Sequence, residues 1–187
     1  MIDFYLHKYT NTESIMSGIV APHKHRHSFY KRQGQNMLND ILTAWEKDKK
    51  KILSLYITHL EKLFDKKETF LLFIPPTNTR IFIEDIVEKI KSEFPNIIDL
   101  VDCFNKKSDV NFGSDEFKNY TIEQLSEYIQ IDNNKLSKVD NNVIKAFIAD
   151  DVYSTGKTIE LTKYLIKTSI SNVIEIKSGV ILITTKN

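Results

Sequence analysis

Apolar residues recur at helical spacing through much of the first third of the chain. Between Met37 and Phe64 they return every three or four positions, which predicts helix. The charged stretch from Glu46 to Lys51 interrupts this pattern. It is either the exposed face of one long helix or a break between two helices. We therefore expect residues 1–66 to form a mainly helical N-terminal extension.

The pattern changes after residue 66. Residues 69–74 are continuously apolar, as in a strand buried on both faces of a parallel sheet, and Pro75 and Pro76 end this run. Thr121 and Gln124 have the spacing of a capping box at the start of a helix. Further strands are predicted at 97–104 and 143–149, one strand or a pair at 173–184, helices at 83–94, 122–129 and 161–168, and polar loops at 105–120 and 132–140. Strands that alternate with helices predict an α/β core with a parallel sheet in residues 67–187.

Composition and charge are those of a globular protein with one core. The 187 residues, 41% of them hydrophobic, are too few for two ordinary domains. No apolar run reaches the length of a membrane span, and the first residues lack the pattern of a signal peptide, so we expect a cytoplasmic protein with no membrane partner. A net charge of +1 does not favour nucleic acid as a partner. The single cysteine, Cys103, excludes an intramolecular disulfide and argues against a cysteine-based zinc site.

The most informative segment is residues 146–160, which read AFIADDVYSTGKTIE. A predicted strand ends in two carboxylates, Asp150 and Asp151, and a short turn then leads into a helix. The turn offers a phosphate the hydroxyls and backbone N–H groups at the helix start, a flexible glycine and a lysine; its residues are Ser154, Thr155, Gly156, Lys157 and Thr158. The two carboxylates suit the hydroxyls of a ribose and can support a hydrated Mg²⁺. Together these groups describe a pocket for a ribose 5-phosphate.

Two other interpretations of this segment are weighed. Gly156, Lys157 and Thr158 could end a nucleotide-triphosphate loop, but that motif needs a glycine where Asp151 stands, and a carboxylate there would repel the phosphate. An ordinary strand, turn and helix would explain each residue singly, since Asp and Gly are common in turns, but not their joint order.

In its order and spacing the segment resembles the 5-phosphoribosyl-1-pyrophosphate (PRPP) signature of type I phosphoribosyltransferases. The resemblance covers about residues 70–184 and implies a parallel-sheet α/β domain of that type, behind the helical N-terminal extension. It implies PRPP or another ribose 5-phosphate compound as ligand, Mg²⁺ as cofactor, and transfer of the phosphoribosyl group to a nucleobase or other nitrogen acceptor with release of pyrophosphate. Asp150 and Asp151 would then be catalytic and hold the ribose diol and Mg²⁺, directly or through water. A homodimer is left open.

An upstream loop in this family holds the pyrophosphate of PRPP, and residues 73–80 lie at the corresponding place between a strand and a helix. Thr77, Asn78 and Thr79 offer hydroxyl and amide donors, and Arg80 offers a guanidinium suited to bidentate phosphate contact and to catalysis. The proline-bearing entry to this loop looks most like that of ComF-type competence proteins. Residues 105–120, with Lys106 and Lys107, correspond to the mobile loop that the family places over the reacting centre.

The chain also differs from the families that it resembles. It lacks the four-cysteine zinc ribbon that ComF-type proteins commonly carry. Hypoxanthine-guanine enzymes have an aspartate before the TGKT sequence, where this chain has Ser154, so the acceptor is open. A sensor or accessory protein of this fold, as in competence or defence systems, is therefore the alternative to an enzyme. His23, His25 and His27 alternate as metal ligands on a strand would, but lysine and arginine lie between them. We interpret residues 1–36 as a basic segment and a candidate hood over the acceptor.

Overall fold

The computed structural model describes residues 2–9, 35–77, 81–107, 110, 112, 115–139, 142–153 and 155–184. Its elements, in chain order, are β1 (Phe4–Tyr9), α2 (Gln35–Leu60), β2 (Leu71–Phe73), α3 (Ile81–Glu93), β3 (Ile98–Asp99), β4 (Phe104–Lys106), the 3₁₀ turn η1 (Asp115–Phe117), α4 (Ile122–Ser126), β5 (Ile129–Ile131), α5 (Asn133–Leu136), β6 (Lys145–Tyr153), α6 (Lys157–Ser169) and β7 (Glu175–Thr184).

Five strands form one sheet in the order β1-β7-β6-β2-β3, and every neighbouring pair in it is parallel. The prediction of an α/β fold with a parallel sheet is therefore confirmed. Strand β6 is central, and Phe73 of β2 lies opposite Ile148 of β6. A separate antiparallel pair, β4 with β5, lies beyond β3 in the chain.

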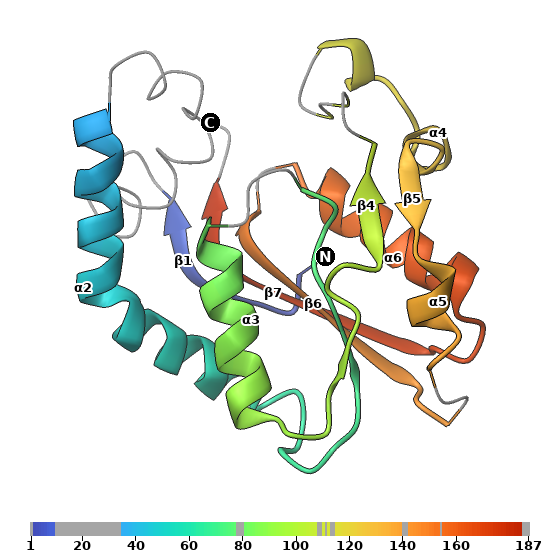
Figure 1. Ribbon diagram of the computed structural model, residues 1–187, viewed down its shortest axis with the longest axis horizontal. Coiled ribbons are helices and arrows are strands. Elements are labelled where there is room, and N and C mark those ends of the chain that lie inside the picture. Colours follow the sequence, from blue (N-terminus) through green and yellow to red (C-terminus); the bar gives the residue numbers. More distant parts are fainter. Residues whose placement is uncertain are drawn as a thin grey trace.

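Helices cover both faces of the sheet, as Figure 1 shows with α2 and α3 on one side and α6 on the other. The alternation of side chains along β6 divides the core accordingly. Phe147 and Ala149 belong to the apolar cluster that contains the buried residues of α2 and α3. Ala146 and Ile148 belong to the cluster that contains those of α6 and of the β4–β5 region. Burial on both faces explains why this strand is apolar at every position from 146 to 149.

The helix boundaries agree well with the sequence pattern. Helix α3 ends at Glu93, just before Pro95, and α2 runs through the charged stretch 46–51 without a break. At the start of α4 the capping box is present, because the Thr121 hydroxyl accepts from the backbone of Gln124 and the Gln124 side chain accepts from the backbone of Thr121. None of the described helices is long and apolar enough to cross a membrane.

Strand β1 is the main element that the sequence pattern did not predict. This six-residue strand pairs with β7, which lies at the other end of the chain. Asp3 supports the pairing: its backbone N–H donates to the Ser178 carbonyl at 2.8 Å, and its carboxylate accepts from the Ser178 N–H at 2.7 Å. The first described residues thus belong to the main sheet. The proposed domain division at residue 66 stays a prediction.

Several boundaries between 97 and 140 also differ from the prediction. The strand predicted at 97–104 is divided into β3 and the start of β4, with a turn between them. Ile129 begins β5 and does not continue α4, because the helix ends after one and a half turns. The polar stretch 132–140 contains the short helix α5, whose first N–H groups are capped by the Asp132 carboxylate. We call the described residues from 104 to 139 the insert.

Candidate functional site

The strand order creates a switch point between β2 and β6. From β2 the chain crosses through α3 to β3 on one side, and from β6 it crosses through α6 to β7 on the other. The two connections leave in opposite directions and on opposite faces, so the carboxyl ends of β2 and β6 form a switch point at which a crevice is expected. In open α/β sheets this is where ligands bind. Of the two segments that the sequence singles out, 75–80 follows the end of β2, and 150–158 begins within β6 and continues past its end.

The register makes this adjacency specific. Phe73 is the last paired residue of β2, and its partner on β6 is Ile148. Pro75 and Asp150 therefore lie at equivalent positions, each two residues beyond the Phe73–Ile148 pair. Thr77 is partly buried just beyond, whereas Asn78, Thr79 and Arg80 lie outside the described residues. The start of the predicted pyrophosphate loop and the acidic pair are thus neighbours in the fold.

The acidic pair lies within β6 rather than after it. Asp150 is 2% exposed and Asp151 is 4% exposed. The Asp151 backbone N–H donates to Oδ1 of Asp150 at 2.9 Å. Burying carboxylates is costly, and folds accept this cost most often at functional sites. Their burial at the crevice favours a functional role for the pair over an ordinary turn.

A tyrosine from α2 lies next to this pair. The hydroxyl of Tyr56 donates to the Gly179 carbonyl at 2.8 Å, and the side chain is only 1% exposed. Burial raises the pKa of Tyr56 well above its ordinary value, and the negative charges of Asp150 and Asp151 raise it further, while a backbone hydrogen bond with Asp150 acts in the opposite direction. The phenol is therefore kept neutral beneath the acidic pair. Sequence pattern alone marks Tyr56 as one more apolar position of the helix.

The turn after β6 has the backbone expected of an anion site. Gly156 has φ 77°, a left-handed conformation that disfavours any residue with a Cβ. It is the N-cap of α6, so the cap position carries no side-chain oxygen that would compete with a ligand for the first N–H groups. Thr155 is exposed, and its hydroxyl accepts a hydrogen bond from the backbone N–H of Lys157 at 3.4 Å. Ser154 lies outside the described residues.

Lys157 does not present its ammonium group to this turn. Its Nζ donates to three backbone carbonyls of the insert: those of Phe117 at 3.2 Å, Lys118 at 2.7 Å and Tyr120 at 3.2 Å. In a nucleotide-triphosphate loop the corresponding lysine must reach the β- and γ-phosphates. The contacts of Lys157 therefore add to the argument from Asp151 against that motif. At the turn itself, Lys157 contributes its backbone N–H, which donates to the Thr155 hydroxyl at 3.4 Å.

The lysines predicted for the mobile loop are also engaged. Lys106 lies over the ring of Phe112, 5.2 Å from its centroid, and burial lowers its pKa. The ammonium of Lys107 donates to the Glu127 carbonyl at 2.7 Å. Both contacts close the insert on itself. His23, His25 and His27, for which the sequence does not favour a metal site, lie outside the described residues.

The donor set at β6 fits Mg²⁺ only together with a ligand. Within the described residues, no group of three or more His, Cys, Asp and Glu side chains could hold a metal ion. Two carboxylates without further protein ligands are nonetheless typical of Mg²⁺, which keeps several waters and binds substrate phosphates. Asp150 and Asp151 would hold such an ion together with the oxygens of a bound phosphate compound.

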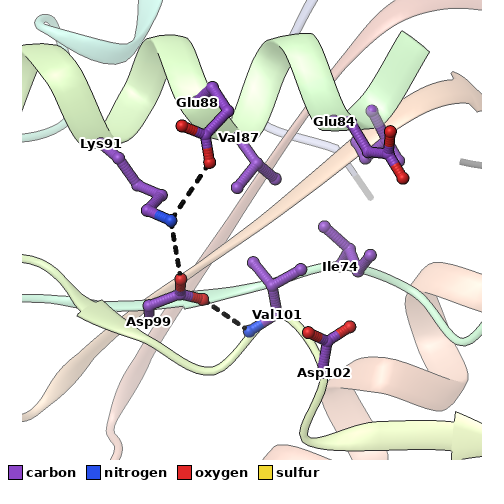
Figure 2. Close-up of a pocket in the computed structure, with 9 residues that line it drawn as sticks. Ile74, Glu84, Val87, Glu88, Lys91, Asp99, Val101 and Asp102 are labelled. Carbon is purple, nitrogen blue, oxygen red and sulfur yellow. Dashed lines mark hydrogen bonds and ion pairs between the residues drawn. The ribbon is translucent and has the colours of Figure 1, made fainter. Parts of the chain in front are cut away.

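A cavity lies beside the start of the loop that follows β2. It has a volume of about 190 Å³ and is situated between α3 and the segment after β3 (Figure 2). Lys91 crosses it, with ion pairs to Glu88 at 3.1 Å and to Asp99 at 3.2 Å. Its lining residues are Ile74, Ile83, Glu84, Val87, Glu88, Lys91, Asp99, Val101 and Asp102. Four carboxylates against one lysine make this cavity unsuitable for a phosphate group.

Comparison with known proteins gives a limited result. No protein-family model and no curated protein matches the chain. Among solved structures, it is similar to a hypoxanthine phosphoribosyltransferase from Staphylococcus aureus in a tetragonal crystal, with a TM-score of 0.42, 18% identity, and coverage of 74% of this chain and 64% of that one. The same enzyme in an orthorhombic crystal gives a TM-score of 0.43, 15% identity, and coverage of 76% and 69%. Similarities of this size do not assign the chain to a family.

Proposed function

We propose that this protein binds PRPP with Mg²⁺ at the crevice between β2 and β6 and transfers its 5-phosphoribosyl group to a nitrogen acceptor, releasing pyrophosphate. One observation carries the proposal. The strand order places the start of the loop after β2 beside the segment that holds the acidic pair and the glycine-bearing helix start, although the loop and that segment are far apart in the sequence. PRPP needs three such subsites, for a diol, a 5′-phosphate and a pyrophosphate.

The 5′-phosphate subsite is the turn from Ser154 to Thr158. The left-handed Gly156 lets the backbone approach the ligand closely, and the first N–H groups of α6 point out of the helix at the positive end of its dipole. The hydroxyls of Thr155 and Thr158 add donors. Since Lys157 is engaged with the insert, this subsite would bind phosphate through hydrogen bonds and the helix dipole rather than through a lysine charge.

The diol subsite is the acidic pair. Carboxylates accept hydrogen bonds from vicinal hydroxyls, and the same oxygens can support a hydrated Mg²⁺. Asp150 and Asp151 are at most 4% exposed, so ligand binding has to uncover them. When bound, Mg²⁺ would supply positive charge that neutralises the pyrophosphate leaving group. Both carboxylates would counter positive charge that develops on the ribose ring.

The pyrophosphate subsite is the loop after β2. Thr77, Asn78 and Thr79 supply neutral donors, and Arg80 supplies a planar guanidinium that suits phosphate oxygens. The proline-bearing entry at Pro75 and Pro76 is the feature that the chain shares with ComF-type proteins. The start of this loop follows the same rung of the sheet as the acidic pair, which brings the two subsites together.

The chemistry asked of these residues is mainly positioning and charge stabilisation. The bond between the anomeric carbon and the pyrophosphate oxygen breaks, a nitrogen lone pair of the acceptor forms the new bond, and pyrophosphate leaves with the bonding electrons. The ribose passes through a cationic state, which the acidic pair stabilises, while Arg80 stabilises the departing anion. No strong protein nucleophile is needed.

A second candidate is a PRPP or nucleotide sensor that binds without turnover. The observation that favours it is Ser154, which stands where purine enzymes of similar sequence have an aspartate for the base. Without that acid, the described residues contain no group that we can assign to acceptor recognition. A sensor would need the three subsites above and no acceptor site.

Calorimetry with PRPP and Mg²⁺, followed by a pyrophosphate-release assay with a panel of nucleobases, tests the proposal. An enzyme binds PRPP and releases pyrophosphate with at least one acceptor, whereas a sensor binds and releases none. Absence of PRPP and ribose 5-phosphate binding would show that both candidates are wrong. Tighter binding of ATP than of PRPP would support the nucleotide-triphosphate interpretation instead.

A further inference from the structure

The ammonium of Lys157 is enclosed by backbone oxygens that all come from one short stretch of the insert. The carbonyls of Phe117, Lys118 and Tyr120 lie 3.2, 2.7 and 3.2 Å from its Nζ. A lysine has three N–H donors, and three acceptors meet them here. The lysine charge and the partial charges of three carbonyls form a compact contact, which we call the Lys157 clamp.

The clamp joins two parts of the molecule that are distant in the chain. Lys157 is the first residue of α6, directly after Gly156, so its backbone belongs to the proposed phosphate turn. The clamped residues extend from the last residue of η1, Phe117, to Tyr120, just before the N-cap of α4, and lie about forty positions earlier. Two lysines of the insert make polar contacts elsewhere. Lys107 donates to a carbonyl within the insert, and Lys135 forms an ion pair at 3.7 Å with Asp102, which lies between β3 and β4. Lys157 connects the insert to the turn itself.

The clamped segment is itself a well-packed unit. Phe117 is 4% exposed, and its ring packs edge-on against those of Tyr120 and Tyr128, with centroids 5.1 Å apart in both cases. The Tyr120 N–H donates to the Phe117 carbonyl, which closes a turn, and the capping box of α4 begins at the next residue, Thr121. A displacement of Lys157 therefore moves or releases a folded piece of the insert, not a single side chain.

We propose that Lys157 is a positioning residue that couples occupation of the phosphate turn to the ordering of residues 117–120. A phosphate bound by the N–H groups at the start of α6 fixes the backbone of Lys157 and so fixes the donor end of the clamp. The fastened segment in turn holds that backbone in its binding conformation. Because such coupling is reciprocal, loss of the clamp must weaken the ligand by the same factor by which the ligand strengthens the clamp. The ligand half of this proposal rests on the proposed function.

Amide hydrogen exchange of residues 117–121, with and without ribose 5-phosphate, tests the coupling. Lys157→Met keeps side-chain length and apolar contact but removes all three donors. Lys157→Arg keeps the charge, but a planar fork cannot place three donors at one point. Lys163→Met is the matched control, since Lys163 lies on the same helix and pairs with Glu160 of that helix at 3.4 Å.

Without ligand, Lys157→Met should speed exchange at 117–121 about tenfold, Lys157→Arg should have a smaller effect, and Lys163→Met should have none. Saturating ribose 5-phosphate should slow exchange of this segment in the wild type and in Lys163→Met, but much less in Lys157→Met. The affinity of Lys157→Met for ribose 5-phosphate should fall about three- to tenfold. Circular dichroism establishes whether each variant is folded. If Lys157→Met is unfolded, the same exchange and affinity measurements are made on Lys157→Arg.

Wild-type exchange rates at 117–121 in a folded Lys157→Met would overturn the clamp. Equal protection by ribose 5-phosphate in wild type and Lys157→Met would overturn the coupling. If the wild type binds neither ribose 5-phosphate nor PRPP, the proposed function is wrong and the coupling to ligand is wrong with it. The ligand-free comparison still decides in that case whether Lys157 fastens the insert, so the two failures are distinguishable.

Discussion

The hydroxyl of Tyr56 donates a 2.8 Å hydrogen bond to the carbonyl of Gly179, which joins the long helix α2 to strand β7 directly beside the acidic pair of β6. The bond spans 123 positions of the chain. It gives the N-terminal helix a structural part in the site, since the phenol supports the sheet where Asp150 and Asp151 are buried. Removal of one hydroxyl should therefore affect both stability and the site.

Tyr56→Phe should lower the free energy of unfolding by about 1–2 kcal/mol, because a buried carbonyl loses its donor. The raised pKa of Tyr56 adds a pH dependence. The unfolded chain loses the phenolic proton near pH 10, whereas the folded protein keeps it, so wild-type stability is intact below about pH 10 and falls above it. Urea unfolding between pH 8 and 11 should show a smaller fall for Tyr56→Phe. Parallel curves for the two proteins would contradict the neutral buried phenol.

Gly179→Ala should destabilise the protein, because a Cβ at this position would overlap the ring of Phe4. The Phe4 ring is itself buried, against Tyr56 at 4.9 Å and Phe147 at 6.0 Å between ring centroids, so it cannot simply turn away. We expect a loss of about 1–3 kcal/mol in thermal or urea unfolding. Phe4→Leu should relieve part of this cost. Additive effects of Gly179→Ala and Phe4→Leu would show that the two residues are not in contact.

Substitution of Gly156 separates backbone conformation from side-chain bulk. Gly156→Ala places a Cβ at φ 77° and should cost about 1–2 kcal/mol of stability, whereas Gly156→Asn should cost less because asparagine tolerates the left-handed region. Both variants should bind ribose 5-phosphate more weakly than wild type, because their side chains restrict backbone approach. Thermal unfolding and calorimetry measure the two effects. Unchanged affinity in both variants would place the phosphate elsewhere.

The double variant Asp150→Asn with Asp151→Asn tests whether the acidic pair serves catalysis. Side-chain size is kept and amides can still bond the ribose hydroxyls, so PRPP affinity should fall modestly. Turnover should fall much further, because the carboxylates matter most when the ribose ring carries positive charge. Kinetics of pyrophosphate release compared with calorimetry separate the two effects. Undiminished turnover in the double variant would show that the pair has no catalytic role.

Arg80→Ala should weaken PRPP more than ribose 5-phosphate, since only PRPP carries the pyrophosphate that this guanidinium is proposed to bind. We expect a difference of about 1–3 kcal/mol between the two ligands, as for a lost charge-assisted hydrogen bond. Competition calorimetry gives both values. An equal loss for both ligands would show that Arg80 acts on the fold or on the other phosphate.

Local pattern was enough for much of the fold. The apolar runs at 69–74 and 143–149 predicted β2 and β6 because strands buried on both faces must be apolar at every position. The capping box at Thr121 and the proline at 95 predicted helix ends for equally local reasons. The motif from Asp150 to Thr158 could be recognised from the sequence because its proposed chemistry depends on residues that are neighbours in the chain. The pattern did not predict β1, since a short strand is defined by the partner to which it bonds.

Tertiary structure alone decided which of these pieces meet. The order β1-β7-β6-β2-β3 depends on packing between segments far apart in the chain, and it is this order that places Pro75 beside Asp150. Sequence could show that Tyr56 is apolar on one face of a helix, but not that its hydroxyl reaches Gly179. It could show a lysine in the turn, but not that the carbonyls of Phe117, Lys118 and Tyr120 would surround its ammonium. Backbone carbonyls occur at every residue, so only their arrangement in space distinguishes these three.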